Sequence, residues 1–307
     1  MPSTAAITKV EATRALGAIV RAEWDIVDEA IAAAVEHAST TGRPLVHPFD
    51  DLDVIAGQAT LGQEIVEDVP DVAALIVPLG GGGLLAGIGV ALERAGCRAR
   101  LIGVRSEDAP PRAPGTTMVP SRASVADGIA VRTKGRFTVP LVEELADDVV
   151  RVDDDDTAEA IVHLFERAKL VVEGAGAVGV AALLRGLFDP AITAGPDGTI
   201  VVVLSGGNID PGLFGDAIRR HEIKVGRRLA IVTRLDDRPG ALVRLLTGIA
   251  DLGANVLDID HQRDGIDLPF GTTAVQLVVQ TRDRAHGEAV LAWARDAGFD
   301  IARVFGG

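Results

Sequence analysis

The chain has 307 residues, of which 48% are hydrophobic and 24% are charged, so it is long enough to bury a full core, in about two domains. Its formal net charge of −14 argues against nucleic acid as a partner, since phosphate backbones are bound by clustered Lys and Arg. A single cysteine, Cys97, excludes a disulfide within the chain. Neither a signal peptide nor a long apolar span is found, so we expect no membrane association and a cytoplasmic protein.

The first predicted elements lead up to a glycine-rich stretch. Apolar residues at helical spacing predict a helix over 25–41. Residues 44–48 then predict a short strand, and Asp51 or Asp53 is expected to cap a helix that runs towards Val69. Together these elements predict one βαβ succession.

Four consecutive glycines lie between an apolar run, 72–77, and a helical segment, 84–95. Strand, glycine loop and helix is the predicted order, because glycines without Cβ let the backbone approach a ligand while the helix adds the positive end of its dipole. A tight turn with positive φ is the alternative, and it explains one or two glycines better than four. The stretch therefore predicts a phosphate site.

A dinucleotide-binding loop is one interpretation of this phosphate site. Gly81, Gly83 and Ala86 match the loose G-x-G-x-x-A pattern, and Glu107 follows a predicted strand at 101–104, where a ribose-binding acid is expected. A single match of this kind is weak evidence for a nicotinamide cofactor.

A second strand-to-glycine stretch favours a different cofactor. Residues 200–204 predict a buried strand that delivers Ser205, Gly206 and Gly207 to its carboxyl end. A nicotinamide site has no use for this hydroxyl group.

Other polar features are interpreted as structural. Residues 148–152 predict a strand, and the acids at 153–156 are typical of a helix start, since four contiguous acids cannot all face one metal ion. His47 is interpreted as a packing residue, because no carboxylate is paired with it in the sequence. Residues 208–211 predict the capped start of a helix.

Four motifs carry a family resemblance: Pro78 to Leu84, Ala126 to Ala130, Val172 to Ala177 and Leu204 to Asn208. In this order and spacing they resemble the fold-type II pyridoxal-phosphate (PLP) enzymes. Within these the chain is most similar to the L-threonine (L-serine) dehydratases that carry a C-terminal ACT domain. The resemblance implies a three-layer αβα domain of the tryptophan synthase β type, which binds pyridoxal phosphate, followed by a ferredoxin-like ACT domain.

The resemblance also implies roles for individual residues. Ser205 is expected beside the pyridine nitrogen, where a neutral hydroxyl withdraws electrons moderately and so suits loss of a β-hydroxyl group; a plain turn is the alternative. Glu173 is expected to orient the ring. Asp127 and Gly128 are expected to border the substrate pocket, although Asp-Gly is equally typical of a turn. The expected cofactor-binding residues are Gly80, Gly81, Gly82, Gly83, Leu84, Glu173, Ser205 and Gly206.

The N-terminal segment departs from the family pattern. Met1 and residues 9–18 resemble an internal part of the family's small cofactor domain, so about the first quarter of a family member is expected to be missing. That part would carry the Schiff-base lysine, which is both the anchor of the cofactor and the α-proton base. None of the lysines present resembles it in context; they are Lys9, Lys134, Lys169 and Lys224.

From this departure we predict that the chain lacks the catalytic lysine, binds pyridoxal phosphate non-covalently at best, and is catalytically incompetent alone. A misplaced start codon, a truncated gene or a processed fragment would each explain it. We also predict no bound cation, because Arg105 and Pro111 stand where the resemblance places acidic ligands, next to Ala109.

A new succession of predicted strands and helices begins after Gly226. Strands are predicted at 229–233, 255–261, 273–280 and 301–304, with helices after Gly240 and near 284–297. This βαββαβ order in about 80 residues is ferredoxin-like. The expected domains are 1–48, a remnant of the small PLP subdomain; 49–225, the large PLP-binding domain; and 226–307, the ACT domain.

A loop in the last domain resembles the ligand loop of ACT domains, where backbone around a glycine meets an amino acid at a subunit interface. A plain turn is the alternative. An exposed strand edge makes pairing between chains, and so a homo-oligomer, the expectation. The expected ligand residues are Asp237, Arg238, Pro239, Gly240 and Ala241.

The resemblance thus implies an amino-acid substrate, a possible amino-acid effector, and PLP-dependent dehydration and deamination of L-threonine or L-serine to 2-oxobutanoate or pyruvate and ammonia. Two other functions stay open at this point. One is a non-enzymatic amino-acid sensor built on the ACT domain, and the other is a nicotinamide-dependent enzyme.

Overall fold

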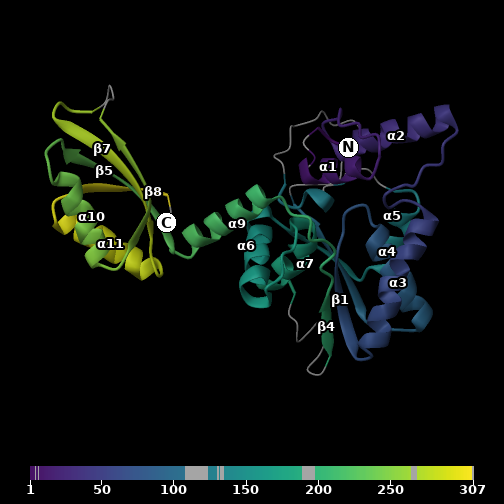
Figure 1. Cartoon of the computed structure of the whole chain (residues 1–307). Coiled ribbons are helices and arrows are strands. Elements are labelled where there is room, and N and C mark those ends of the chain that lie inside the picture. The colour runs from purple at the N-terminus through teal and green to yellow at the C-terminus, as the bar shows by residue number, and fades with distance from the viewer. Residues whose placement is uncertain are drawn as a thin grey trace. The chain divides into compact units, whose positions relative to one another are not determined.

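The computed structural model describes residues 1–3, 5, 7–107, 124–129, 131, 135–188, 198–263 and 268–305. The chain divides into two compact units, Met1–Phe214 and Gly215–Gly307 (Figure 1). The division falls within helix α9, Pro211–Lys224. The finer domain bounds expected from the sequence stay a prediction.

The first unit is built on a four-stranded parallel sheet with the order β3-β2-β1-β4. Six of the seven residues of the central strand β1 are buried, as its apolar sequence predicts. The strands are β1 (Val72–Pro78), β2 (Arg100–Ser106), β3 (Asp148–Val152) and β4 (Thr199–Val202).

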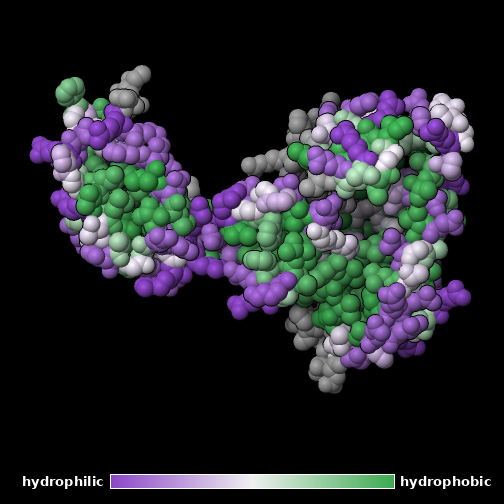
Figure 2. Space-filling view, in the orientation of Figure 1, coloured by the Kyte–Doolittle hydropathy of each residue, from purple (hydrophilic) through white to green (hydrophobic). Residues whose placement is uncertain are grey.

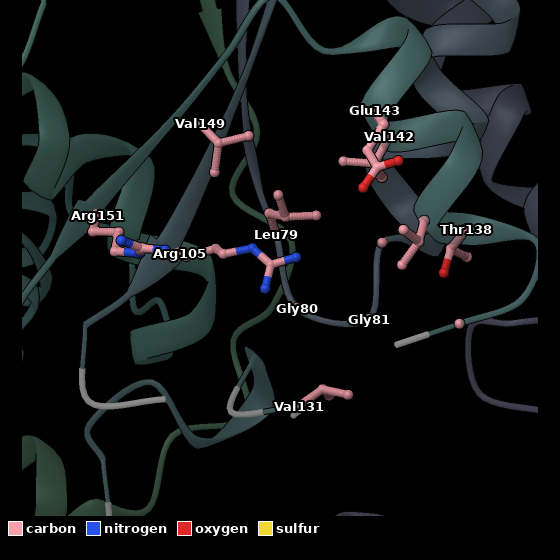
Figure 3. A pocket seen from close by; sticks show the side chains of 13 residues that line it. Leu79, Gly80, Gly81, Arg105, Val131, Thr138, Val142, Glu143, Val149 and Arg151 are labelled. Carbon is pink, nitrogen blue, oxygen red and sulfur yellow. The ribbon is translucent and has the colours of Figure 1, made fainter. Parts of the chain in front are cut away.

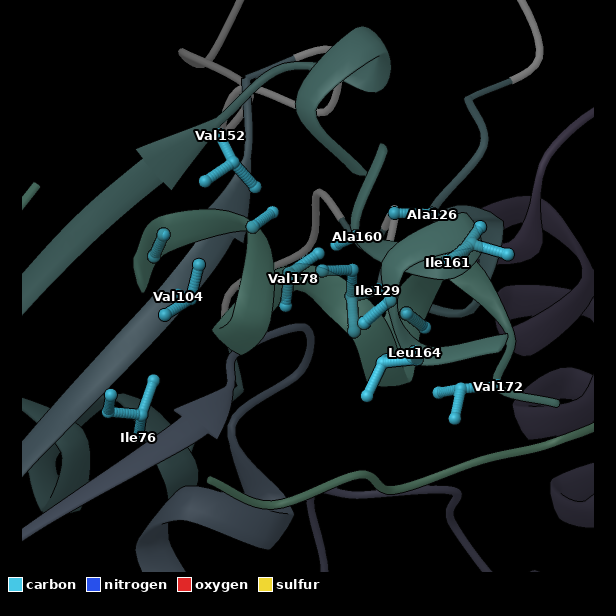
Figure 4. Packing of buried hydrophobic residues seen from close by; sticks show 14 residues of the cluster. Ile76, Val104, Ala126, Ile129, Val152, Ala160, Ile161, Leu164, Val172 and Val178 are labelled. Carbon is cyan, nitrogen blue, oxygen red and sulfur yellow. The ribbon is translucent and has the colours of Figure 1, made fainter. Parts of the chain in front are cut away.

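Helices cover both faces of this sheet. Successive residues of β1 point to opposite sides, so its apolar residues need a covering layer on each face. Leu75 and Val77 pack with α3 and α4 on one face. Ile76 lies in a second cluster with residues of α6 and α7 on the other face, as Figure 4 shows. The expected three-layer αβα architecture is therefore confirmed. The helices concerned are α3 (Leu52–Asp68), α4 (Gly83–Ala95), α6 (Asp154–His163) and α7 (Gly174–Leu184).

The remaining elements of the first unit are short or lie at its N-terminal end. In α2 no residue is buried, so the predicted apolar stripe has no core to face among the described residues. These elements are α1 (Ile7–Ala15), α2 (Val27–Thr41), the 3₁₀ turn η1 (Asp127–Ile129), α5 (Thr138–Leu145) and the π-helical turn η2 (Leu164–Ala168).

Two strand predictions differ from the structure. Residues 44–48 form no strand, so the predicted βαβ succession is wrong; Pro44 and Pro48 lack the amide N–H of a ladder, and Val46 is 82% exposed. The strand predicted as buried at 200–204 ends at Val202 and is only half-buried, because β4 lies at the edge of the sheet.

The predicted helix caps are confirmed. The Asp51 carboxylate accepts hydrogen bonds from the backbone N–H groups of Asp53 and Val54 at the start of α3. Asp153 accepts from the Asp156 N–H at 2.8 Å and caps α6, so the run of acids has the structural role that the sequence favours.

The second unit has the predicted βαββαβ order and an antiparallel sheet with the order β6-β7-β5-β8, which is the ferredoxin-like arrangement. Its core joins the inner residues of the sheet to both helices. The elements are β5 (Arg228–Asp236), α10 (Ala241–Asp251), β6 (Asn255–Gln262), β7 (Thr272–Gln280), α11 (Arg284–Asp296) and β8 (Asp300–Phe305).

Strand β6 is an edge of this sheet and carries two exposed apolar residues, Leu257 and Ile259. Figure 2 shows apolar residues on the visible face of the second unit, bordered by hydrophilic ones. Within the described ranges, no helix combines the length and the apolar character needed to cross a bilayer.

Candidate functional site

The glycine loop lies where the sequence places it, between the end of β1 and the start of α4. The N–H of Leu79 donates to the carbonyl oxygen of Val104 at 2.8 Å, which ties the start of the loop to β2. Gly82 has φ of 94° and is the N-cap of α4, and no side chain caps this helix. The loop and the first turn of α4 therefore offer backbone N–H groups and the positive end of a helix dipole.

The glycines of this loop are also required by packing. A Cβ on Gly81 would lie 2.3 Å from Cγ of Phe49, and one on Gly83 would lie 2.9 Å from the Phe49 carbonyl oxygen. A Cβ on Gly80 would lie 2.9 Å from Cα of Ile129. Close packing thus accounts for three glycines and positive φ for Gly82, so the glycine count alone does not establish an anion site.

A cavity of about 510 Å³ is lined by the glycine loop, and it gives the loop the space for a ligand that the glycine count alone does not establish. Seven of the eight residues expected to bind the cofactor line it, and Gly128 of the expected substrate pocket joins them. The predicted residues in the lining are Gly80, Gly81, Gly82, Gly83, Leu84, Gly128, Glu173 and Ser205.

Gly206 is the one expected cofactor-binding residue that does not line the cavity, and it lies against the side chain of Glu173. A Cβ on Gly206 would lie 2.2 Å from Oε1 of Glu173, so only glycine leaves room for the carboxylate. The Glu173 N–H also donates to the Gly206 carbonyl oxygen at 3.0 Å. Backbone of Asp127 is in η1, whereas its side chain lies outside the described part of the chain, so its predicted role stays a prediction.

Three segments that are far apart in the sequence meet beside Glu173: the start of the 126–130 motif, the 172–177 motif and the 204–208 motif. A Cβ on Gly174 would lie 2.0 Å from the carbonyl oxygen of Val125, and one on Gly176 would lie 3.0 Å from the N atom of Gly206. The glycines of the 172–177 motif therefore let the other two segments approach closely, which places Glu173 and Ser205 on one cavity.

The sequence reasoning missed Phe49 and its neighbour Asp50. Asp50 was one of several acids before α3, and only Asp51 and Asp53 were considered as caps. The Asp50 carboxylate instead accepts backbone hydrogen bonds from Arg136 (2.7 Å), Phe137 (2.8 Å) and Thr138 (3.1 Å). Asp50 thereby fixes the start of α5 beside the glycine loop.

These hydrogen bonds set the protonation of Asp50. Burial by itself would raise its pKa, but the bonds from the three N–H groups, helped by the charge of His47, lower the pKa below the ordinary value of 3.8. No pattern in the sequence links residue 50 to residues 136–138, so this contact could not be predicted.

His47 and Lys169 have the structural environments that the sequence favours. Nδ1 of His47 accepts from the Asp50 N–H at 2.8 Å, and its ring meets Phe49 edge-on. Lys169 ends η2 with φ of 59°, and its Nζ donates to the carbonyl oxygen of Glu166 at 2.8 Å. Lys134 lies outside the described residues.

The residues of the cavity fit pyridoxal phosphate. The uncapped start of α4 suits a phosphate group. Ser205 offers a neutral hydroxyl and Glu173 a carboxylate on the same cavity. The described ranges contain no group of three or more His, Cys, Asp or Glu able to hold a metal ion. Ala109 and Pro111, which the cation prediction invokes, lie outside those ranges.

The second unit has a cavity of its own, of about 530 Å³. All five residues of the expected ACT ligand loop, 237–241, line it, together with His261 and Arg263. The guanidinium of Arg263 lies 3.4 Å from the Asp237 carboxylate. Gly240 has φ of 90° and begins α10 without a side-chain cap.

Comparisons with known proteins identify the family of the chain. A family model described as "Pyridoxal-phosphate dependent enzyme" matches residues 1–206. A protein of Thermotoga maritima named L-threonine ammonia-lyase is 41% identical over 309 residues, which cover 99% of this chain and 76% of that protein. A Geobacter sulfurreducens protein of the same name is 43% identical over 305 residues, 97% of this chain and 74% of the relative.

Solved structures give the same result for the fold. The processed form of threonine deaminase isoform 2 from Solanum lycopersicum superposes with a TM-score of 0.59 at 30% identity, covering 72% of this chain and 65% of that one. Maize serine racemase superposes with a TM-score of 0.60 at 30% identity, covering 72% of this chain and 68% of the other.

Proposed function

Because the chain belongs to the family of pyridoxal-phosphate-dependent enzymes, we propose that it acts in the deamination of L-threonine, and of L-serine, to 2-oxobutanoate or pyruvate and ammonia. The observation that carries this proposal is the meeting of the predicted motifs on one cavity beside an uncapped helix start. The family assignment favours pyridoxal phosphate over a nicotinamide cofactor.

The glycine loop is proposed to bind the cofactor phosphate. Its N–H groups lie at the positive end of α4, where an anion is stabilised by the helix dipole and by unpaired donors. Phe49 closes one side of the loop through its contact with Gly81. The phosphate is thereby expected to be held by backbone, with no basic side chain required.

Ser205 and Glu173 are proposed to position the cofactor ring. When bound, pyridoxal phosphate supplies an electron sink that acidifies the α-proton of an amino acid and favours loss of its β-hydroxyl. A neutral hydroxyl from Ser205 at the ring nitrogen would keep that withdrawal moderate. Glu173 lies against Gly206 and lines the same cavity, where its carboxylate is suited to orient the ring.

The proton base is not assigned to any residue of the cavity. No lysine is among the described residues that line it. None of the four lysines resembles the family's Schiff-base lysine in its sequence context, and on that ground we propose that the chain binds pyridoxal phosphate without a stoichiometric covalent link and does not turn over alone.

Borohydride trapping tests these statements together. The purified chain is titrated with pyridoxal phosphate, reduced, and examined by intact mass and peptide mapping, while L-threonine is assayed for 2-oxobutanoate. We expect saturable binding, no single stoichiometric adduct and no 2-oxobutanoate. We also expect L-threonine and L-serine to change the absorbance of the bound cofactor more than that of free cofactor.

The outcomes separate the two claims. A stoichiometric adduct at one lysine with production of 2-oxobutanoate would support the proposed reaction and contradict catalytic incompetence. Failure to bind pyridoxal phosphate at any concentration would contradict the proposed function itself.

We also propose that the second unit is an ACT domain that binds an amino-acid effector and that the chain is a homo-oligomer. The cavity at the 237–241 loop and the free edge of β6 support this. Calorimetry with isoleucine and valine tests the site, with Asp237→Asn as the variant and Asp251→Asn as the control, and light scattering gives the mass. Effector binding without any binding of pyridoxal phosphate would favour the sensor alternative.

A further inference from the structure

A second, smaller cavity of about 240 Å³ lies against the glycine loop, between α5 and the ends of β2 and β3 (Figure 3). It shares Gly80, Gly81, Gly82 and Val131 with the cofactor cavity, but the rest of its lining is different. Nothing in the proposed deamination uses these other residues.

Two guanidinium groups lie at one end of this cavity. Arg105 of β2 and Arg151 of β3 are direct register partners in the parallel sheet, so their side chains leave the same face next to each other. Figure 3 shows the Arg105 side chain reaching from β2 towards Leu79 and Gly80. In the described part of the chain neither arginine forms an ion pair with a carboxylate.

Burial and, next, the charge of Arg151 lower the pKa of Arg105 from its usual value, although an arginine stays protonated in proteins. Arg105 is half-buried, whereas Arg151 is exposed at the rim of the cavity, so water screens part of the repulsion between them. An anion beside the half-buried Arg105 guanidinium would offset the cost of its burial.

Thr138, at the start of α5, gives an independent indication of a ligand. Its side chain is fully buried and lines the cavity, and its Oγ1 has no hydrogen-bond partner among the described residues. Buried hydroxyl groups are almost always paired, which makes the Thr138 hydroxyl a candidate donor to a ligand in the cavity that it lines.

Most of the remaining wall is apolar. It consists of Leu79, Val131, Val139, Val142 and Val149. Glu143, on α5, is the one acid among the described residues of the lining, and it is exposed, so water screens its charge. The volume is below the range of about 300–1,000 Å³ typical of larger ligands, so the occupant is small.

We propose that this cavity binds a small aliphatic carboxylate, with the carboxylate group held by Arg105 and Thr138, the exposed Arg151 adding positive charge at the rim, and the short hydrocarbon body against the valines. Arginine presents paired N–H donors that match a carboxylate, and the threonine hydroxyl gains a partner that the described residues do not provide. The apolar wall favours a hydrocarbon body over a bare inorganic anion.

The test uses butanoate as the probe and ligand-observed NMR on the full chain to obtain a dissociation constant. We expect butanoate to bind, and excess pyridoxal phosphate not to displace it. Arg105→Gln should weaken binding at least tenfold, because a hydrogen bond to a charged group is lost. Thr138→Val should weaken it severalfold, whereas Thr138→Ser, which keeps the hydroxyl, should retain it.

Arg98→Gln is the matched control, since it removes the same charge from an exposed position ahead of β2. Its affinity should equal that of the unaltered chain. Circular dichroism establishes that each variant is folded. If Thr138→Val does not fold, the butanoate affinity of Arg105→Gln alone tests the proposal. The proposal is overturned if butanoate does not bind, if Arg105→Gln binds it unchanged, if pyridoxal phosphate displaces it, or if only inorganic phosphate binds.

Discussion

The ring of Phe49 lies directly on the backbone of Gly81, so closely that a Cβ added to Gly81 would come within 2.3 Å of the ring atom Cγ. Phe49 is held in place by its own neighbours, since its N–H donates to Nδ1 of His47 at 3.3 Å and its ring meets the imidazole edge-on. One side of the glycine loop is therefore covered by an aromatic ring that is itself in contact with His47.

Gly81→Ala should therefore be destabilising. The added methyl group cannot be accommodated unless Phe49 or the loop moves, and such overpacking typically costs about 1–3 kcal/mol. Urea unfolding measures this loss. We also expect weaker binding of pyridoxal phosphate, because the displaced loop no longer aims its N–H groups at one point.

Gly57→Ala is the matched control. Gly57 lies within α3, and a Cβ there meets no atom within 4 Å. Alanine in a helix interior is favoured over glycine by about 0.5–1 kcal/mol, so this variant should be neutral or more stable. Equal stability of the two variants would contradict the packing that we describe at Gly81.

Asp50 connects the N-terminal side of this wall to α5, and its loss should destabilise the first unit. Asp50→Ala removes an acceptor from the N–H groups of Arg136, Phe137 and Thr138, and we expect a loss of about 1–3 kcal/mol. Asp50→Asn keeps one carbonyl acceptor and should lose less.

The effect of Asp50 should depend on pH in a defined direction. Because the pKa in the folded state lies below the ordinary value of 3.8, the stabilisation is complete above that value and disappears as the pH falls through the folded-state pKa. Unfolding of the parent and of Asp50→Asn should therefore differ at neutral pH and converge in strong acid. A difference that stays constant down to the lowest accessible pH would contradict this.

Much of the fold could be predicted from local patterns. The apolar run of β1 and the caps at Asp51 and Asp153 each depend on neighbours in the sequence, and each was predicted correctly. The strand at 44–48 was wrong because strand propensity counts only when a partner strand is present.

For the site, too, the sequence predicts local features but not tertiary contacts. The glycines pointed to the loop, but their packing against Phe49 and Ile129 depends on tertiary contacts that no spacing encodes. The pairing of Arg105 with Arg151 follows from the register of β2 and β3, which the sequence does not specify. The resemblance of the motifs, in contrast, was enough to bring Glu173 and Ser205 to one cavity.

In the second unit, Gly248→Ala should be strongly destabilising. A Cβ on Gly248 of α10 would lie 1.7 Å from Cζ2 of Trp293 on α11, so the two helices could not keep their distance. We expect a loss of about 3 kcal/mol by urea unfolding. Gly287→Ala in α11, whose Cβ would have its nearest neighbours at 3.9 Å, should be tolerated, and an equal loss there would contradict the packing.

The final prediction concerns Glu173, whose carboxylate packs on Gly206 and lines the cofactor cavity. Glu173→Gln keeps the shape of the side chain and its backbone hydrogen bond to Gly206, so stability should change little. If the charge orients the ring, the dissociation constant for pyridoxal phosphate should rise about tenfold, as expected for one lost charge-assisted interaction of about 1.4 kcal/mol. Absorbance titration measures this, with Glu144→Gln on the exposed side of α5 as the control. An unchanged affinity and an unchanged spectrum of the bound cofactor in Glu173→Gln would remove the proposed role and leave Glu173 as a packing residue against Gly206.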